Sequence, residues 1–277
     1  HPVSTPIKKN ISLIQLTNFL RKVKLSSRPN QIMNGTMHGS VSYLIYNLIH
    51  WIWFKTAPPP AACFFAFLFG MFPDFDGIIF SIKQGDAKHD TQFQHHLNSW
   101  FHWPIRWSPL IVIFLITLIL DFYPQYFLIP TLGIYLHLIF DSAGCGDGMM
   151  WGHGWNREQF ARYINLFSSK TDGYHGNYWG ARYKKTIFYK MENVFAVIVV
   201  VLSIYYLIAI HGLNAWDIVV IGFVVILVIT TALGPADKYK KEPPEGRYAD
   251  YRKNEEYLAW MKEHGYKFND NYQPVKN

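Results

Sequence analysis

Residues 70–102, GMFPDFDGIIFSIKQGDAKHDTQFQHHLNSWFH, decide how this chain is organised. An apolar segment ends in Pro73-Asp74-Phe75-Asp76, and a polar loop with four histidines follows it. Burying carboxylates and imidazoles beside lipid is expensive unless they pair with one another or bind a metal. The stretch therefore predicts a functional site at the mouth of a membrane-like segment.

The composition around this stretch is typical of a polytopic membrane protein with substantial loops. Half of the 277 residues are apolar. Only 16% are charged, against roughly 25% in soluble domains. Two cysteines, Cys63 and Cys145, are too few for a disulfide framework and lack the paired spacing of a structural zinc site. Residues 1–37 lack the compact apolar core of a signal peptide.

Six apolar segments predict an all-α fold, a polytopic membrane helical bundle of about six spans. They are residues 39–54, 61–72, 108–122, 126–142, 194–210 and 216–233. The first two are shorter than the roughly 20 residues of a full crossing, so they are expected to tilt, to lie in thinned bilayer, or to end below the surface. The chain then divides into a basic amphipathic segment (1–37), a metal-site membrane domain (38–190), two additional spans (191–233) and a polar tail (234–277).

The distribution of charge predicts the orientation of the bundle. Threading six spans places every Lys and Arg except Lys55 on the side of the long loops. The positive-inside rule then puts the loops and both termini in the cytoplasm, with the spans in the inner or plasma membrane. This asymmetry accounts for the net charge of +7, so the lipid bilayer is an expected partner and nucleic acid is not. Residues 7–24 predict either a helix lying on the membrane or a solvated helix on the loops.

Each loop-side end of the first four spans carries a histidine or an aspartate. His137 and Asp141 lie four residues apart, on one face of the fourth span. Imidazole and carboxylate ligands together suit zinc or another first-row divalent ion. The expected ligands are His38, Asp74, Asp76, His96, His102, His137 and Asp141. Seven ligands exceed one tetrahedral site and would fill two, bridged by a shared aspartate.

Plainer interpretations exist for single members of this set. His137 with Asp141 also fits a buried hydrogen-bonded pair, and a Pro-Asp dipeptide is a common helix terminator. His95 and His96 are adjacent and do not easily face one metal from a regular helix, so one of the two is expected to bind, and His96 is the choice here. The four-part pattern is more specific than any one of its members.

The order of these elements resembles the YdjM-type family of membrane-bound metal-dependent hydrolases. That family has a His at its first helix, as His38 here, then a Pro-Asp-x-Asp turn, a His-rich segment and a His-x-x-x-Asp helix. The resemblance covers about residues 37–155. This chain departs from the pattern at 95–102, HHLNSWFH, where the family has His-Arg-x-x-Thr-His. The last helix is also similar, more distantly, to multi-zinc phospholipases C and single-strand nucleases.

This resemblance implies a membrane-embedded hydrolase with one or two divalent ions, zinc being the first choice. The more distant similarity to phospholipases C and nucleases implies a phosphoester as substrate, attacked by metal-activated water at the lipid surface. Asp76 or Asp147 is expected to act as general base. The candidate phosphate contacts are Arg106, Arg157 and Arg182.

Two other functions compete with hydrolysis. The first is a non-catalytic structural or assembly subunit of a larger membrane complex, with a vestigial or structural metal site. Residues 1–37 and 234–277 favour it, because segments rich in Tyr, Lys and Glu suit protein partners. The second, a transporter, would place its ionisable groups at the bilayer midplane, whereas here they gather at one edge.

Overall fold

A computed structural model describes residues 35–76, 100–144, 176–233, 237–241, 255–263, 265–268 and 274–277. Within these ranges the chain is mainly helical, which confirms the all-α prediction for its main part. The exception is a small antiparallel hairpin, β1 (Tyr266–Phe268) with β2 (Pro274–Lys276), in the predicted polar tail. The helix proposed at 7–24 lies outside the described residues.

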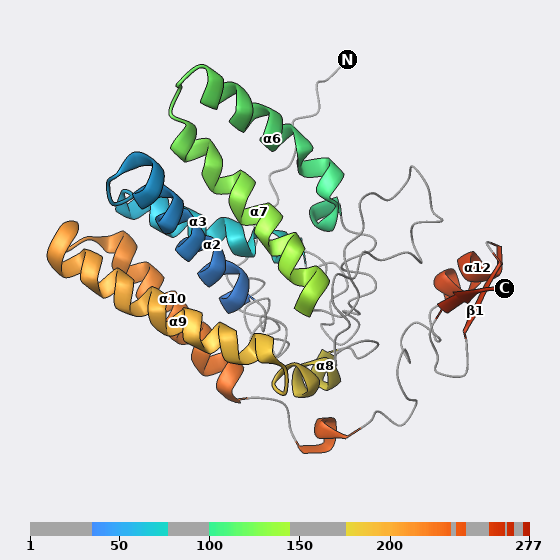
Figure 1. The fold of residues 1–277 in the computed structure, drawn as a ribbon. Helices are drawn as coiled ribbons and strands as arrows, with labels where there is room; N and C mark the ends of the chain where they lie inside the picture. Colours follow the sequence, from blue (N-terminus) through green and yellow to red (C-terminus); the bar gives the residue numbers. More distant parts are fainter. Residues whose placement is uncertain are drawn as a thin grey trace, which may run out of the picture.

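All six apolar segments are helices (Figure 1). The long helices are α2 (Gly35–Ile49), α3 (Pro60–Met71), α6 (Pro104–Ile119), α7 (Pro124–Gly144), α9 (Ile187–Tyr205) and α10 (Ala215–Leu233). α2 and α9 each continue into a π-helical segment, η2 (His50–Phe54) and η7 (Tyr206–Ile210). The shorter helices are η3 (Phe72–Asp74), η5 (Trp100–His102), α8 (Gly176–Tyr183), η8 (Asp237–Lys240) and α12 (Glu255–Glu263).

Local sequence explains where several of these helices begin and end. Pro60 and Pro104 stand at the first positions of α3 and α6, where a proline lacks only an N–H that would be unpaired anyway. Lys55 adopts a left-handed backbone (φ 60°) and ends η2. Asp121 and Tyr123 are also left-handed (φ 50° and 49°), which makes the tight turn between α6 and α7.

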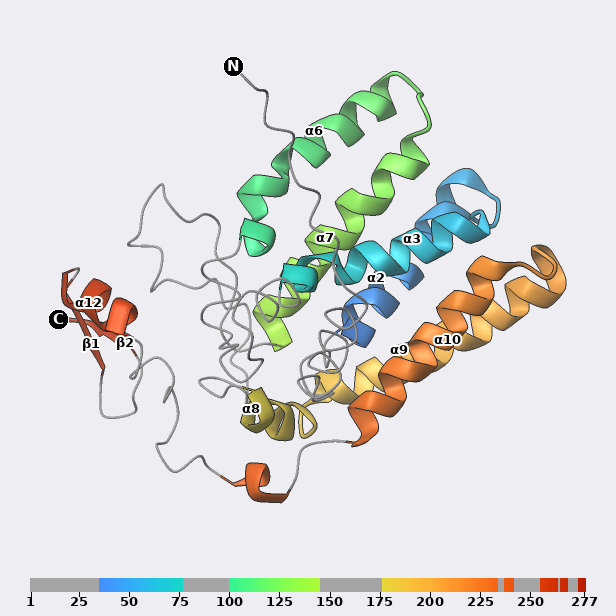
Figure 2. The same cartoon turned by 180° about the vertical axis from the view of Figure 1, so that it is seen from behind.

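The six helices form three hairpins packed side by side, as both views of the ribbon show (Figures 1 and 2). The α2–α3 hairpin lies in the middle, with α6–α7 against one side and α9–α10 against the other. The main core is buried between α2, α3, α9 and α10 and includes Tyr43, Phe67, Val199 and Val224. This arrangement brings α2, α3 and α7 into mutual contact. α2 and α7 carry His38, His137 and Asp141, and the end of α3 leads directly into η3, which carries Asp74.

Glycines allow the three central helices to come unusually close. A Cβ added at Gly70 of α3 would lie 2.4 Å from the carbonyl oxygen of His38 on α2. A Cβ at Gly133 of α7 would lie 2.8 Å from the backbone of Phe69 on α3. Real Cβ atoms do not approach other atoms this closely, so only glycine permits this packing. Small residues at helix crossings are typical of helices that associate in membranes.

Among the described residues, two helices are long and apolar enough to cross a membrane: Ile187–Ile210, which joins α9 and η7, and Ala215–Leu233, which is α10. Their outward sides carry exposed large apolar residues such as Val201 and Ile226. Helix α6 and the α3–η3 segment are apolar but shorter. These two helices fit the prediction of membrane association by length and composition, and a bundle of six spans stays a prediction.

Candidate metal centre

Five of the predicted ligands converge at one end of the central helices. They are His38 in the first turn of α2, Asp74 in η3, His102 at the end of η5, and His137 and Asp141 on α7. All but one of these side chains are at most 2% exposed, and Asp74 is 30% exposed. Charged or polar groups buried to this extent require partners, because their desolvation is costly.

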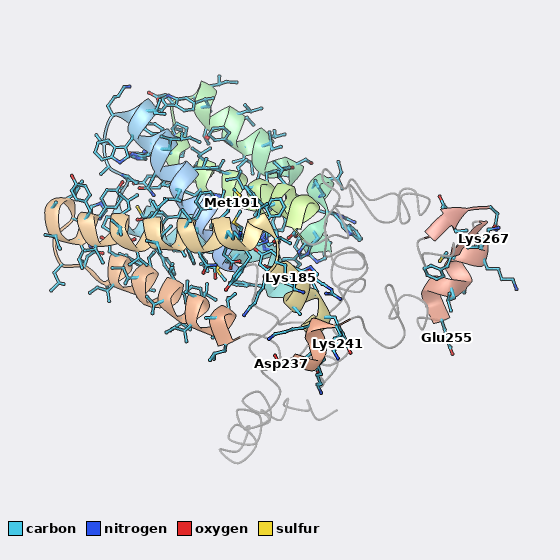
Figure 3. The ribbon with its side chains drawn as sticks, turned by 60° about the horizontal axis from the view of Figure 1, so that its bottom comes forward. Lys185, Met191, Asp237, Lys241, Glu255 and Lys267 are labelled. Carbon is cyan, nitrogen blue, oxygen red and sulfur yellow. The ribbon has the colours of Figure 1, made fainter. Side chains whose placement is uncertain are left out.

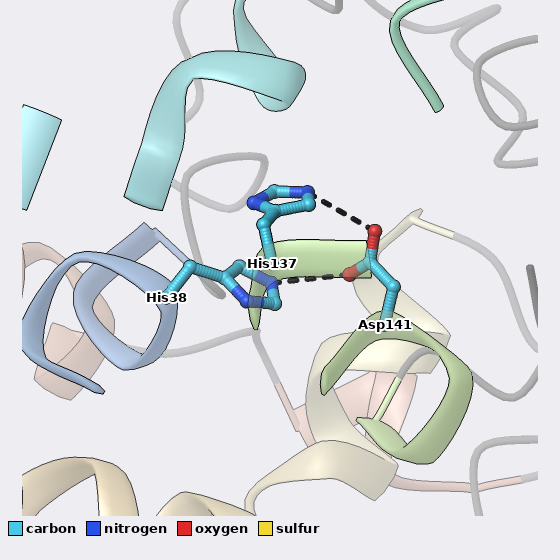
Figure 4. A group of neighbouring side chains, drawn as sticks. All are labelled: His38, His137 and Asp141. Carbon is cyan, nitrogen blue, oxygen red and sulfur yellow. Dashed lines mark ion pairs between the residues drawn. The ribbon is translucent and has the colours of Figure 1, made fainter. Parts of the chain in front are cut away.

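Asp141 is held between two imidazoles (Figure 4). Its Oδ1 lies 3.1 Å from Nε2 of His38, and its Oδ2 lies 3.1 Å from Nε2 of His137. The two imidazole rings face each other with centroids 3.9 Å apart. One carboxylate therefore joins a ligand from α2 to a ligand from one turn earlier on its own helix.

A second group of ligands adjoins the first through His137. Oδ1 of Asp74 lies 3.5 Å from Nε2 of His137 and 3.7 Å from Nε2 of His102. Nε2 of His102 also lies 3.5 Å from Oδ2 of Asp141. Within each group, His38–His137–Asp141 and Asp74–His102–His137, the ligand atoms all lie within 4.8 Å of one another.

Hydrogen bonds on the outer nitrogens aim two of these imidazoles inward. Nδ1 of His137 lies 2.8 Å from the carbonyl oxygen of Gly70. Because that oxygen only accepts, Nδ1 carries the proton and donates it. Nδ1 of His102 is likewise 3.0 Å from Oδ2 of Asp76. Both rings then direct Nε2 into the cluster, in the manner of metal-binding histidines whose other nitrogen is held by a carbonyl or carboxylate.

The inner atoms of the cluster fit a divalent cation. In the described part of the chain, Nε2 of His137 is buried and makes no properly aligned hydrogen bond, although Oδ2 of Asp141 is only 3.1 Å away. With Nδ1 protonated, a neutral ring presents a lone pair there toward a carboxylate oxygen. Lone pairs at this distance repel unless Nε2 is protonated or a cation lies between them. Imidazole nitrogen and carboxylate oxygen are the donors that first-row divalent ions accept.

The structure thus brings together His38, Asp74, His102, His137 and Asp141 from four separate segments. Asp76 borders this cluster and contacts it through His102, and its roles as ligand and general base stay predictions. The remaining two predicted site residues, His96 and Asp147, lie outside the described residues.

The candidate phosphate-binding arginines have separate environments. Arg106 lies over the ring of Trp103, 5.7 Å from its centroid. Nη1 of Arg182 donates to the carbonyl oxygen of Lys240 at 3.1 Å, in the α8–η8 region. Arg157 lies outside the described residues. The role of all three in binding phosphate stays a prediction.

Gly70 contributes to the candidate site but was not among the residues predicted from the sequence. It allows α2 to approach α3, and its carbonyl oxygen orients His137. A signal for close helix packing was present in the small-residue spacing Gly35-x-x-x-Gly39 on α2. No pattern in the sequence, however, identifies a particular backbone carbonyl as the partner of a histidine.

Comparison with known proteins adds no relative: no family model, curated protein or solved structure matches this chain. The resemblance to membrane-bound hydrolases therefore depends on the motif residues alone.

Proposed function

We propose that this protein is a membrane-embedded, metal-dependent hydrolase that acts on a phosphoester at the membrane surface. One observation carries the proposal: a buried carboxylate, Asp141, has an imidazole nitrogen 3.1 Å from each of its two oxygens. His137 joins this group to Asp74 and His102. Such a set of donors on four segments suits a divalent ion, and zinc is the first choice for His and carboxylate ligands.

The residues of the cluster would have two roles: some hold the ion in the buried base of the site, and one leaves it accessible from outside. His38, His137 and Asp141 form the buried base of the site. Asp74, which is 30% exposed, forms its accessible side, so a substrate reaches the site there. When bound, the ion would act as a Lewis acid toward a phosphoryl oxygen and would make water more acidic.

Asp76 has a positioning role in this proposal. Its Oδ2 accepts a hydrogen bond from Nδ1–H of His102, which directs Nε2 of that ring toward Asp74 and Asp141. A carboxylate used in this way is less available as a general base. Asp147 remains the other predicted base.

Metal analysis joined to an activity assay tests the proposal. The full chain is purified in detergent, dialysed against EDTA, and reloaded with zinc, manganese or magnesium. Metal per chain and hydrolysis of bis-p-nitrophenyl phosphate are then measured. We expect H137A and D141A to lose both the metal and the activity. The control is H50Q, because His50 is a buried histidine of the same α2–η2 helix whose Nδ1 contacts Thr56 instead.

Two results would remove the hydrolase proposal. One is a preparation with no stoichiometric metal after reloading. The other is hydrolysis that persists at the wild-type rate in H137A and D141A.

Burial of the site favours a second candidate, a structural or assembly subunit. Four of the five ligands are at most 2% exposed, and closed metal sites with little solvent access are typically structural. Metal retained without turnover on any phosphoester would favour this function. Stable partner proteins that are lost when residues 234–277 are deleted would favour it further.

A further inference from the structure

Lysine and arginine side chains gather at the end of the bundle where α9 begins and α10 ends. Two segments supply them, the stretch from the end of α8 to α9 and the η8 turn. We call Arg182, Lys184, Lys185, Lys238, Lys240 and Lys241 the basic cluster. Figure 3 labels Lys185 and Lys241 at this end of the molecule, with Asp237 beside them.

Hydrogen bonds to backbone carbonyls hold the first segment of the basic cluster against the end of α10 and against η8. Nζ of Lys184 donates to the carbonyl oxygen of Ala232 at the end of α10, at 3.3 Å. Nη1 of Arg182 donates to the carbonyl oxygen of Lys240 at 3.1 Å. The rings of Tyr178 and Tyr239 meet edge to face, 5.1 Å apart. The cations are thus placed next to one another by neutral acceptors.

Positive charge exceeds negative charge in these segments. Asp237 forms an ion pair with Lys240. Glu192, the one acidic residue of the described stretch 176–193, is buried and accepts a hydrogen bond from Tyr183. Burial, and after it the positive charge of nearby Lys240, lowers the pKa of Lys184. The other lysines of the cluster are exposed, so the excess positive charge lies on the surface of the protein.

The basic cluster lies just beyond the apolar ends of both helices that can cross a membrane. Lys184 and Lys185 precede the Ile187–Ile210 helix, and η8 follows shortly after Leu233. Exposed Val194 and Ile229 continue the apolar surface from there. Cations and tyrosines at such positions lie at the depth of lipid headgroups.

We propose that the basic cluster binds the phosphate-bearing headgroups of anionic phospholipids in the adjoining leaflet. This inference rests on the membrane part of the proposed function and is independent of its metal chemistry. Two features favour lipid as the occupant. The positive charge complements anionic headgroups, which attract Lys and Arg near a membrane surface. The cluster is also continuous with the exposed apolar sides of α9 and α10.

Lipid retention by charge-neutralised variants tests this proposal. Full-length protein is reconstituted into equimolar phosphatidylglycerol and phosphatidylcholine vesicles and extracted gently, and the retained lipids are quantified by mass spectrometry. K185Q/K238Q/K241Q removes three exposed cations of the cluster. K55Q/K262Q/K267Q removes three exposed cations elsewhere and serves as the matched control. We expect the preference of the wild type for phosphatidylglycerol to fall by about fivefold per lysine in the cluster variant alone.

The outcomes separate this proposal from the proposed function. An unchanged lipid ratio in the cluster variant, or an equal fall in the control variant, would overturn the headgroup site alone. Wild-type protein that washes off the vesicles at alkaline pH would overturn it together with the membrane part of the proposed function. Metal per chain is measured in the same samples, and we expect it to be equal in all three proteins.

Discussion

Asp141 is the buried carboxylate on which the candidate site is centred. Its carboxylate is 2% exposed and lies between His38 and His137. A buried charge is tolerated when its partners stay in place, and removing one partner of a buried pair typically costs about 3–5 kcal/mol. A cation shared by these three side chains would satisfy the carboxylate and both ring nitrogens at once.

Metal removal separates this arrangement from a simple hydrogen-bonded pair. If the cluster binds zinc, chelation by EDTA will lower the melting temperature of the wild type, because a ligand at a thousandfold excess over its Kd stabilises a fold by about 4 kcal/mol. H137A will melt at the same temperature with and without EDTA. Differential scanning fluorimetry in detergent measures both. A wild type that EDTA leaves unaffected would support the pair without a metal.

Asp76 provides a second test at the scale of single residues. We expect D76A to weaken zinc binding by about 10–100-fold, the usual effect of losing the partner of a metal-binding histidine. D76N is expected to lose less, because its amide oxygen still accepts a hydrogen bond from Nδ1–H of His102. Competition with a chromogenic chelator measures the affinities. Complete loss of metal in D76A, as in H137A, would make Asp76 a ligand instead.

At the scale of helices, the candidate site depends on how closely α2, α3 and α7 pack. Gly70 and Gly133 let the backbones approach, and the carbonyl oxygen of Gly70 then reaches Nδ1 of His137. Polar contacts hold α9 to the other side of α2: the hydroxyls of Tyr43 and Ser203 are 3.0 Å apart, and the Tyr206 hydroxyl donates to Oδ1 of Asn47 at 2.7 Å. The helix that carries His38 is thus fixed on both sides.

A methyl group at Gly70 tests this packing. Its Cβ would meet backbone and side-chain atoms of α2 at 2.4–2.7 Å, so we expect G70A to lose about 1–3 kcal/mol of unfolding free energy and to bind zinc more weakly. G222A is the matched control, because a Cβ there meets nothing within 4 Å and alanine favours the helix by about 1 kcal/mol. Denaturant titration compares the two. Equal stability of both variants would contradict the proposed role of Gly70.

At the scale of the whole molecule, the charges predict which end of the bundle faces the cytoplasm. Lys55 lies in the turn between η2 and α3, and Lys185 lies before α9. If the helices cross the membrane as expected, these two exposed lysines are on opposite sides, with Lys185 on the cytoplasmic side.

Cysteine labelling tests this orientation. K55C and K185C are made in a C145S background, and the remaining cysteine, Cys63, is buried. A membrane-impermeant maleimide applied to intact bacterial cells is expected to label K55C and to label K185C only after lysis. Labelling of both positions in intact cells would contradict the expected topology.

The sequence alone was sufficient for the long helices and for naming most of the residues that meet in the candidate site. Long apolar runs bounded by Pro60, Pro104 and Pro124 specify helices because periodicity and helix-starting residues are local properties of the chain. A His or Asp at each loop-side end marked the candidate site for the same reason. Spacing also showed that His137 and Asp141 share a helical face.

Only the tertiary structure decided which atoms meet across helices. The placement of Asp141 between His38 and His137, the partnership of Asp76 with His102 and the use of the Gly70 carbonyl all depend on helix separation. Helix separation is set by side-chain volumes at several crossings together, so a spacing such as Gly35-x-x-x-Gly39 favours close packing without fixing which atoms meet. The basic cluster has the same origin, because Arg182 and Lys240 lie 58 residues apart in the chain and meet only when α9 and α10 fold back on each other.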